Sequence, residues 1–277
     1  MRAIAHISDL HFGRLDFATL PALAASIIEA KPDVVVVSGD LTQRARASEF
    51  ADARRFLDTL PMPQIVVPGN HDVPLYDAVS RWLSPLGKYR RYICADLEPF
   101  YADDEIAVVG INTARSLTFK NGRINARQVE SSCARLTACP NDTTRILVTH
   151  HPFDVADAPS GRVGRADMAM AGFANCRIDM ILTGHLHASG IGDSSVRYKI
   201  PGYTALLVQA GTATSSRRRG EWNAWNLIRI ARPHVSIDCL IFEPGKGAFA
   251  VSKTERFQFG AAGWSRSSAL AANDDGF

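Results

Sequence analysis

The stretch from Val34 to Asp40 reads Val-Val-Val-Val-Ser-Gly-Asp, a run of four valines that ends in a polar turn. Four consecutive valines are typical of a strand buried on both faces, because a strand with one solvated face alternates apolar and polar residues. The preceding residues 17–30 carry apolar side chains at helical spacing, and Lys-Pro-Asp at residues 31–33 interrupts them. The stretch therefore predicts a buried strand after a helix, with Asp40 at the end of the strand.

Similar apolar runs that end in polar residues recur along the chain. Short strands are predicted at residues 2–8, 64–67, 106–111, 145–149 and 178–182, and helices at 47–60, 126–136 and 165–174. Strand-like runs without intervening helices follow at residues 205–210, 225–230 and 235–241. Alternating helices and strands, followed mostly by strands, indicate a layered α/β architecture.

Composition excludes several classes of protein. The chain has 277 residues, of which 46% are hydrophobic, so one large domain or two smaller ones can bury a sizeable core. A formal net charge of +3 is too small to indicate a nucleic-acid or membrane partner, and the basic run at residues 217–219 is typical of a solvated loop. No apolar stretch approaches membrane-spanning length and no signal peptide is visible, so we expect a cytoplasmic protein without a transmembrane segment.

The cysteines are widely spaced and form no Cys-x-x-Cys pair; they are Cys94, Cys133, Cys139, Cys176 and Cys239. An odd number at wide spacing favours free thiols in a reducing compartment over a disulfide framework. None of them lies inside the polar motifs described next, so a thiol nucleophile is not expected.

Histidines and acids gather where the predicted strands end. Six of the eight histidines follow apolar runs: His11, His71, His150, His151, His185 and His187. The same ends carry Asp9, Asp40, Asn70 and Asp72. Because ligands bind at the carboxyl ends of strands in open α/β sheets, we expect several strands to deliver these oxygen and nitrogen donors to one edge.

This donor set suits metal ions. Imidazole, carboxylate and amide oxygen bind manganese, iron, cobalt or zinc, and the lack of thiolates argues against a structural zinc site. Seven ligands are too many for one ion and fit two, if one carboxylate bridges them; two such ions clamp a phosphoryl centre and generate hydroxide between them. Each motif alone has an ordinary explanation as a cap or turn, and only the ordered set, with a strand before each member, indicates a metal site.

The motifs Asp-x-His, Gly-Asp, Gly-Asn-His-Asp, His and Gly-His-x-His occur in this order between residues 9 and 187. In these residues the chain resembles the calcineurin-like metallophosphoesterase superfamily, and in particular its bacterial class III cyclic nucleotide phosphodiesterases. The resemblance implies an α/β fold, a four-layer αββα sandwich with two mixed β-sheets. It also implies one metal held by Asp9, His11 and His187, a second held by Asn70, His150 and His185, and Asp40 as the bridge.

Two residues are expected to act on the substrate rather than on the metals. The resemblance implies that His71 points over the site, where it stabilises charge on the phosphoryl group or protonates the leaving oxygen, and that Asp72 orients His71. A turn or cap role is the alternative for Asp72. In the His-His-Pro run the family pattern selects His150 as the ligand, which leaves His151 as a supporting, substrate-facing or packed residue.

We therefore expect hydrolysis of a small phosphodiester, such as a cyclic nucleotide, by a metal-bridged hydroxide. The expected cofactors are two divalent or trivalent metal ions, manganese or iron, with zinc or cobalt as alternatives. A pyrophosphohydrolase of nucleotide-linked lipids or sugars, a phosphomonoesterase and a non-catalytic binding module are the alternative functions. No nucleic-acid partner is expected, and the sequence carries no signal for the oligomeric state.

The catalytic domain is expected to span residues 1–258. Residues 73–105 and 154–164 follow polar clusters and are predicted as insertions, either lids over the site or ordinary surface loops. Residues 259–277 are small and polar, and we expect them to form a flexible tail.

Overall fold

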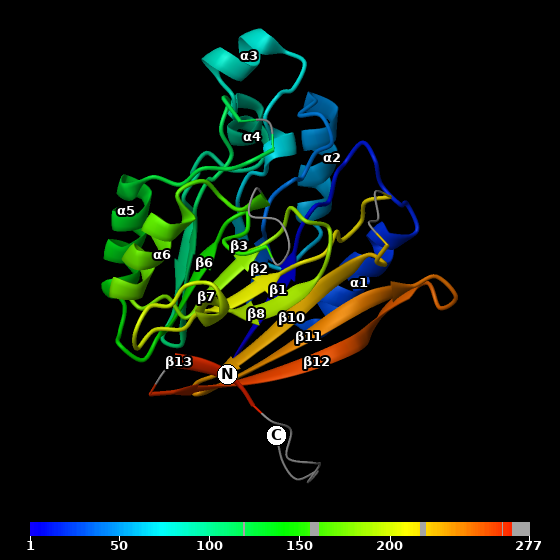
Figure 1. Ribbon diagram of the computed structural model, residues 1–277. Coiled ribbons are helices and arrows are strands. Elements are labelled where there is room, and N and C mark those ends of the chain that lie inside the picture. The colour runs from blue at the N-terminus through cyan, green and yellow to red at the C-terminus, as the bar shows by residue number, and fades with distance from the viewer. Residues whose placement is uncertain (119, 156–160, 217–219, 262, 268–277) are drawn as a thin grey trace.

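Two β-sheets pack face to face, and helices cover the outer face of each sheet (Figure 1). The computed structural model describes residues 1–277 except residues 119, 156–160, 217–219, 262 and 268–277. Both sheets combine parallel with antiparallel strands. The predicted four-layer αββα sandwich with two mixed sheets is therefore confirmed.

Within the described ranges, the first sheet has seven strands in the order β13-β12-β11-β10-β1-β2-β3. They are β1 (Arg2–Ile7), β2 (Val34–Val37), β3 (Gln64–Val66), β10 (Ala224–Ala231), β11 (His234–Glu243), β12 (Ala248–Gly260) and β13 (Gly263–Arg266). Strands β1, β2 and β3 are parallel, whereas β10 to β13 each run antiparallel to their neighbours. The carboxyl ends of β1, β2 and β3 therefore lie at the same edge of the sheet.

The second sheet has the order β4-β5-β6-β7-β9-β8 in the described part of the chain. Its strands are β4 (Phe100–Ala102), β5 (Ile106–Gly110), β6 (Thr144–Val148), β7 (Met180–Thr183), β8 (Gly190–Asp193) and β9 (Leu206–Gln209). The four inner strands are parallel, and β4 and β8 are antiparallel strands at the two edges. This sheet also brings several carboxyl ends to one edge.

Helices form the two outer layers. Those packed on the first sheet are α1 (Thr19–Ala30), α2 (Ala47–Leu57) and α4 (Gly87–Tyr92), and those on the second are α5 (Ala126–Thr137) and α6 (Ala166–Asn175). The described part of the chain also contains the short helix α3 (Ala78–Leu83) and the 3₁₀ turns η1 (Asn70–Asp72) and η3 (Ser194–Val196). Apart from the undescribed segments, the chain has no helix long and apolar enough to cross a bilayer.

The four valines of β2 show why the sheets and helices stack in this order. Val34 and Val36 point between the two sheets, whereas Val35 and Val37 pack on the helical side with Leu23 of α1. All four valines are at most 1% exposed. Each buried valine contributes about 1.5–3 kcal/mol of transfer free energy, and a strand buried on both faces gains this contribution from both layers.

The first predicted insertion contains one helix that packs on the core and one that projects from it. In residues 73–105, α4 belongs to the core, since Tyr89 is fully buried and its hydroxyl donates to the carbonyl oxygen of Val66 at 2.8 Å. The short helix α3 projects from the fold at the top of Figure 1, and its Trp82 is 68% exposed. In residues 154–164, positions 156–160 lie outside the described residues.

The prediction of a flexible tail from residue 259 is wrong for residues 259–266. Strand β12 continues to Gly260, and β13 pairs with it along residues 263–266. Trp264 of β13 is 2% exposed, packs against Phe259, and donates its indole N–H to Asp179 at 2.9 Å. Small residues suggested disorder in the sequence, but the strands on either side of them carry aromatic side chains that complete the core between the sheets. Residues 268–277 of the expected tail lie outside the described residues.

The expectation of five free thiols is also wrong. A disulfide joins Cys133 of α5 to Cys176, which directly follows α6, with Cα atoms 5.4 Å apart. The two helices pack side by side in the same layer, and this tertiary contact links residues separated by 43 positions. The cysteine pattern therefore no longer argues for a reducing compartment.

Replacing Trp264 by alanine tests whether β13 belongs to the folded core. We expect Trp264→Ala to lower the free energy of unfolding by about 3–5 kcal/mol, because the change removes a large buried side chain and a hydrogen bond. Urea unfolding measures the effect, and Trp82→Ala, at an exposed position of α3, is the control with an expected change of about 0.5 kcal/mol or less. Equal stability of the two variants would contradict the core role of β13.

Candidate metal centre

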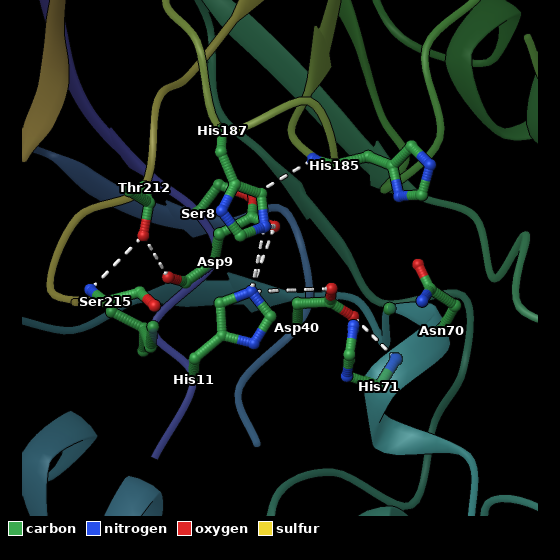
Figure 2. Close-up of polar contacts among 12 residues, drawn as sticks. Ser8, Asp9, His11, Asp40, Asn70, His71, His185, His187, Thr212 and Ser215 are labelled. Atoms are coloured by element: carbon green, nitrogen blue, oxygen red, sulfur yellow. Dashed lines mark hydrogen bonds and ion pairs between the residues drawn. The ribbon is translucent and has the colours of Figure 1, made fainter. Parts of the chain in front are cut away.

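All seven predicted metal ligands lie at strand ends that meet at one edge of the sandwich. Figure 2 shows Asp9, His11, Asp40, Asn70, His185 and His187 at this edge. In the first sheet, Asp9 and His11 follow β1, Asp40 follows β2, and Asn70 begins the η1 turn after β3. In the second sheet, His150 follows β6, and both His185 and His187 follow β7. Parallel strands from two packed sheets therefore deliver the seven side chains to a common site, which the strand-end pattern of the sequence had predicted.

The backbone is strained at this edge. Nine non-glycine residues with positive φ occur in the described ranges, and five of them are predicted ligands: Asp9 (53°), His11 (51°), Asp40 (54°), His185 (76°) and His187 (59°). Positive φ is unfavourable for residues with a Cβ, and such residues gather at functional sites. The concentration at these positions indicates that the fold holds the side chains where an extended strand would not place them.

One half of the centre combines two carboxylates with two imidazoles. The Nε2 atoms of His11 and His187 are 3.1 Å apart. Asp9 Oδ1 lies 3.6 Å from His11 Nε2 and 3.3 Å from His187 Nε2. All three residues are buried, His187 being the most exposed at 6%. One donor atom of each of these residues and one of Asp40 all lie within 4.8 Å of one another, which is close enough to hold a metal ion.

The other half is built around His150. Its Nε2 atom is 3.2 Å from Asn70 Oδ1 and 3.2 Å from His185 Nδ1. Asp40 joins the halves, because its Oδ2 lies 3.4 Å from His150 Nε2 and 3.8 Å from His11 Nε2. This position of one carboxylate oxygen between two imidazole groups is what a bridging ligand requires.

The electrostatics of the centre call for a cation. Burial by itself would raise the pKa of Asp40, but the neighbouring imidazoles, His150 first, outweigh burial and hold that pKa well below its ordinary value. Burial likewise opposes protonation of His150, yet Asp40 raises the pKa of His150 to about 9. Asp9 Oδ1 is completely buried and accepts no hydrogen bond from the described residues. A metal ion would satisfy this oxygen and the facing imidazoles, so the residues fit the two metals implied by the sequence.

A network of serine and threonine hydroxyls fixes Asp9. Its Oδ2 atom accepts the Ser8 hydroxyl at 2.6 Å and the backbone N–H of His185 at 2.9 Å, which leaves Oδ1 to face the imidazoles. The Thr212 hydroxyl donates to the backbone carbonyl of Asp9 at 2.7 Å (Figure 2). Sequence reasoning missed Ser8 and Thr212 as supporting residues. A usable signal was the Thr-Ala-Thr run after β9, another polar cluster at a strand end.

The adjacent histidines His150 and His151 have different roles. His150 donates its Nδ1–H to the carbonyl oxygen of Ser38 at 2.8 Å, so its Nε2 atom faces Asp40. His151 uses both ring nitrogens, because Nε2 donates to the carbonyl oxygen of Lys120 at 2.9 Å and Nδ1 accepts the Thr113 hydroxyl at 2.8 Å. Burial, followed by the charge on His150, lowers the pKa of His151 well below its ordinary value. The geometry favours His150 as the ligand and His151 as its neutral support.

His71 lies over the centre and is anchored by its backbone and by one ring nitrogen. Its backbone N–H donates to Asp40 Oδ1 at 2.8 Å (Figure 2). Its Nδ1–H donates to the carbonyl oxygen of Gln43 at 2.9 Å. The ring is 4.9 Å from the ring of His11, edge to face. Because Nδ1 is engaged, Nε2 is the nitrogen left to act on a bound substrate.

The structure contradicts the expectation that Asp72 orients His71. Both Asp72 oxygens accept hydrogen bonds from the neighbouring loops: Oδ1 from the N–H and hydroxyl of Thr42, and Oδ2 from the N–H groups of Leu41 and Gly69. The carboxylate is 1% exposed, and burial raises its pKa to about 6, with a further contribution from Asp40. Asp72 therefore ties the loop after β2 to the turn after β3, which agrees with the alternative turn role, and the Gln43 carbonyl orients His71 instead.

Gly184 offers a test of how tightly the centre is packed. A Cβ at this position would lie 1.8 Å from Ser8 Oγ and 2.6 Å from Asp9 Oδ2. We therefore expect Gly184→Ala to displace Asp9 and to lower the metal content of protein loaded under standard conditions, as measured by elemental analysis. Gly190→Ala is the matched control, because a Cβ at position 190 meets no atom within 4 Å. Full metal content in Gly184→Ala would show that Asp9 does not depend on this contact.

Comparisons with known protein sequences agree with the geometry of the site. The family model of calcineurin-like phosphoesterases matches residues 2–189. The glycerophosphodiester phosphodiesterase GpdQ of Enterobacter lignolyticus is 38% identical over 80 residues, which cover 25% of this chain and 29% of that protein. A probable cyclic nucleotide phosphodiesterase of Synechococcus is 25% identical over 161 residues, which cover 54% of this chain and 58% of that protein. The matches therefore span less than two thirds of either relative.

Solved structures share the fold at low sequence identity. A dimetal phosphatase from Danio rerio superimposes with a TM-score of 0.60 at 14% identity, covering 86% of this chain and 95% of that one. The purple acid phosphatase PPD1 of yellow lupin superimposes with a TM-score of 0.69 at 11% identity, covering 98% of this chain and 57% of that one. The family model covers well over half of the sequence, and the chain belongs to the calcineurin-like phosphoesterases, a family of metal-dependent phosphoesterases.

Proposed function

We propose that the protein is a phosphodiesterase that works with two metal ions. The observation that carries the proposal is the position of Asp40 Oδ2 between His150 and His11, with an unpartnered Asp9 oxygen beside it. One metal would be held by Asp9, His11 and His187, the other by Asn70, His150 and His185, and Asp40 would bridge them. The nitrogen and oxygen donors suit manganese or iron, with zinc or cobalt as alternatives.

The metals and the protein side chains would divide the chemistry. When bound, the two ions supply Lewis acidity at the phosphoryl oxygens and lower the pKa of the attacking water. The chain orients the ligands through the Ser8 and Ser38 contacts and holds His71 beside the reacting group. His71 Nε2 would donate a proton to the leaving oxygen or stabilise charge on the phosphoryl group. Asp72 would take no part in the chemistry, because its oxygens are occupied by backbone N–H groups and a hydroxyl. It would hold the loop after β2 against the turn after β3.

The charge of the site favours a diester over a monoester. A monoester dianion carries more negative charge than a diester monoanion, and sites specialised for it usually add arginine or lysine near the phosphate. Of the described lysines and arginines, none forms an ion pair with a proposed ligand. Arg44, four residues after Asp40, stacks instead on the ring of Tyr76, 5.7 Å from its centre. The two sequence relatives described above are both named as phosphodiesterases, which points the same way.

Substitution of His71 separates metal binding from chemistry. His71→Ala should keep the metal content of the wild type and lose roughly 10²-fold or more in turnover, as expected for a general acid. The loss should shrink for substrates with a nitrophenolate leaving group, which needs no proton. His234→Ala, at an exposed position of β11, is the control and should leave turnover unchanged. An equal loss for good and poor leaving groups would leave only charge stabilisation as the role of His71.

A comparison of model substrates tests the diesterase proposal. At matched metal and pH, we expect higher kcat/KM on bis(nitrophenyl) phosphate than on nitrophenyl phosphate, because no lysine or arginine of the described residues pairs with a proposed ligand to balance a second phosphate charge. At least one cyclic nucleotide or glycerophosphodiester should also be cleaved. A clear preference for the monoester would replace the proposal by a phosphatase. Turnover confined to nucleotide-diphospho-lipids or sugars would replace it by a pyrophosphohydrolase.

A further inference from the structure

A second group of charged side chains lies at the opposite edge of the second sheet from the metal centre. It lines a pocket of about 180 Å³ between the starts of β6 and β7 and the strand β13. Arg145 is the second residue of β6 and Asp179 directly precedes β7, whereas His150 and His185 follow the other ends of the same two strands. We call it the amino-edge pocket, and its position makes it separate from the metal centre.

Positive charge exceeds negative charge in the amino-edge pocket. Three arginines line it, Arg145, Arg177 and Arg232, with Asp179 as the acidic lining residue among those described. Both Asp179 oxygens are engaged: Oδ1 by Arg232 Nη1 at 3.1 Å and by the Trp264 indole at 2.9 Å, Oδ2 by the backbone N–H of Arg145 at 2.9 Å. The guanidinium groups of Arg145 and Arg177 pair with no carboxylate of the described residues. Two positive charges are therefore unbalanced.

Two polar atoms of the lining residues are buried without a partner. Arg145 is 8% exposed; its Nη1 donates to the carbonyl oxygen of Cys176 at 3.0 Å, but its Nε makes no hydrogen bond with the described residues. The hydroxyl of Thr143, which is 1% exposed, has no partner there either. Buried polar atoms in native proteins are nearly always hydrogen-bonded, and an oxygen ligand held by Arg145 would give its Nε the acceptor that the described residues do not supply.

The wall of the pocket is formed before any ligand binds. The Arg232 guanidinium lies 4.0 Å from the centre of the Phe259 ring, which holds it flat, while Asp179 fixes one of its nitrogens. The indole N–H of Trp264 in β13 donates to the same Asp179 carboxylate and helps to fix it. A preformed cationic wall lowers the cost of ordering side chains when an anion binds.

We propose that the amino-edge pocket binds a phosphate group. Guanidinium forks match the oxygens of phosphate, and two unbalanced positive charges match its dianion better than they match a carboxylate. A pocket of about 180 Å³ is smaller than the ~300–1,000 Å³ of sites for drug-sized ligands, which selects a small phosphate and excludes a whole nucleotide. The proposal does not depend on the activity of the metal centre.

Titration of inorganic phosphate into protein stripped of metal by a chelator tests the proposal by calorimetry. The wild type should bind phosphate at one site, and acetate at least tenfold more weakly. Arg145→Met and Arg177→Gln should each raise the dissociation constant of phosphate roughly tenfold or more, because each removes a charge-assisted donor. Arg127→Gln, an exposed position in the first turn of α5, removes the same charge elsewhere and should leave the constant unchanged.

The variants also separate the amino-edge pocket from other anion sites. Arg177 is exposed, so we expect Arg177→Gln to fold. This variant tests phosphate binding at the pocket even if Arg145→Met fails to fold. Phosphate binding of equal strength in wild type and Arg177→Gln would place the anion elsewhere, for instance on the imidazoles of the metal centre, and would overturn the proposal. Absence of binding in the wild type would overturn it as well, and acetate binding as tight as phosphate would exclude the phosphate assignment.

Discussion

The burial of two carboxylates, Asp9 and Asp40, is the constraint from which the arrangement of the metal centre follows. A buried carboxylate is unfavourable unless charge and hydrogen bonds compensate it. The outer oxygens of both residues are satisfied by the chain, through Ser8, the His185 backbone and the His71 backbone. Among the described residues, the groups that face their inner oxygens are imidazoles at 3.3–3.8 Å. The fold thus satisfies the outer oxygens by hydrogen bonds, and bound metal ions would satisfy the inner ones.

The same constraint explains why the motifs contain glycine. A Cβ on Gly39 would lie 2.7 Å from His150 Nδ1, and one on Gly69 would lie 2.1 Å from Asp40 Oδ1. At Gly39, φ is +96°, which a residue with a side chain also disfavours. Loops from both sheets approach one another at this edge so closely that only hydrogen fits beside the ligands. The glycines are therefore needed for close packing, and the neighbouring acids and histidines provide the chemistry of the same site.

Much of the site could be predicted from the sequence because each proposed ligand lies within a few residues of the end of a buried strand, and parallel strands bring their ends together. The supporting contacts could not be predicted in the same way. Gln43 orients His71 through a backbone carbonyl, which any residue type possesses, and Thr212 meets Asp9 across 203 positions of sequence. Strand β13 was missed because the residues before it are small. The residue that anchors the strand is Trp264, a single aromatic in a polar segment. These features depend on tertiary contacts that leave no local pattern.

The Cys133–Cys176 link has a consequence for the unfolded chain. It closes a segment that spans 43 positions and contains β6 together with His150. In the chain-entropy description, a closed loop of this length lowers the conformational entropy of the unfolded ensemble. The loss raises the free energy of that ensemble by about 4 kcal/mol. The strand that carries a proposed ligand therefore begins folding from a restricted set of conformations when the thiols are oxidised, and from a much larger set when they are reduced. Redox state would in this way alter the stability of the second sheet while every group at the metal centre stays chemically the same.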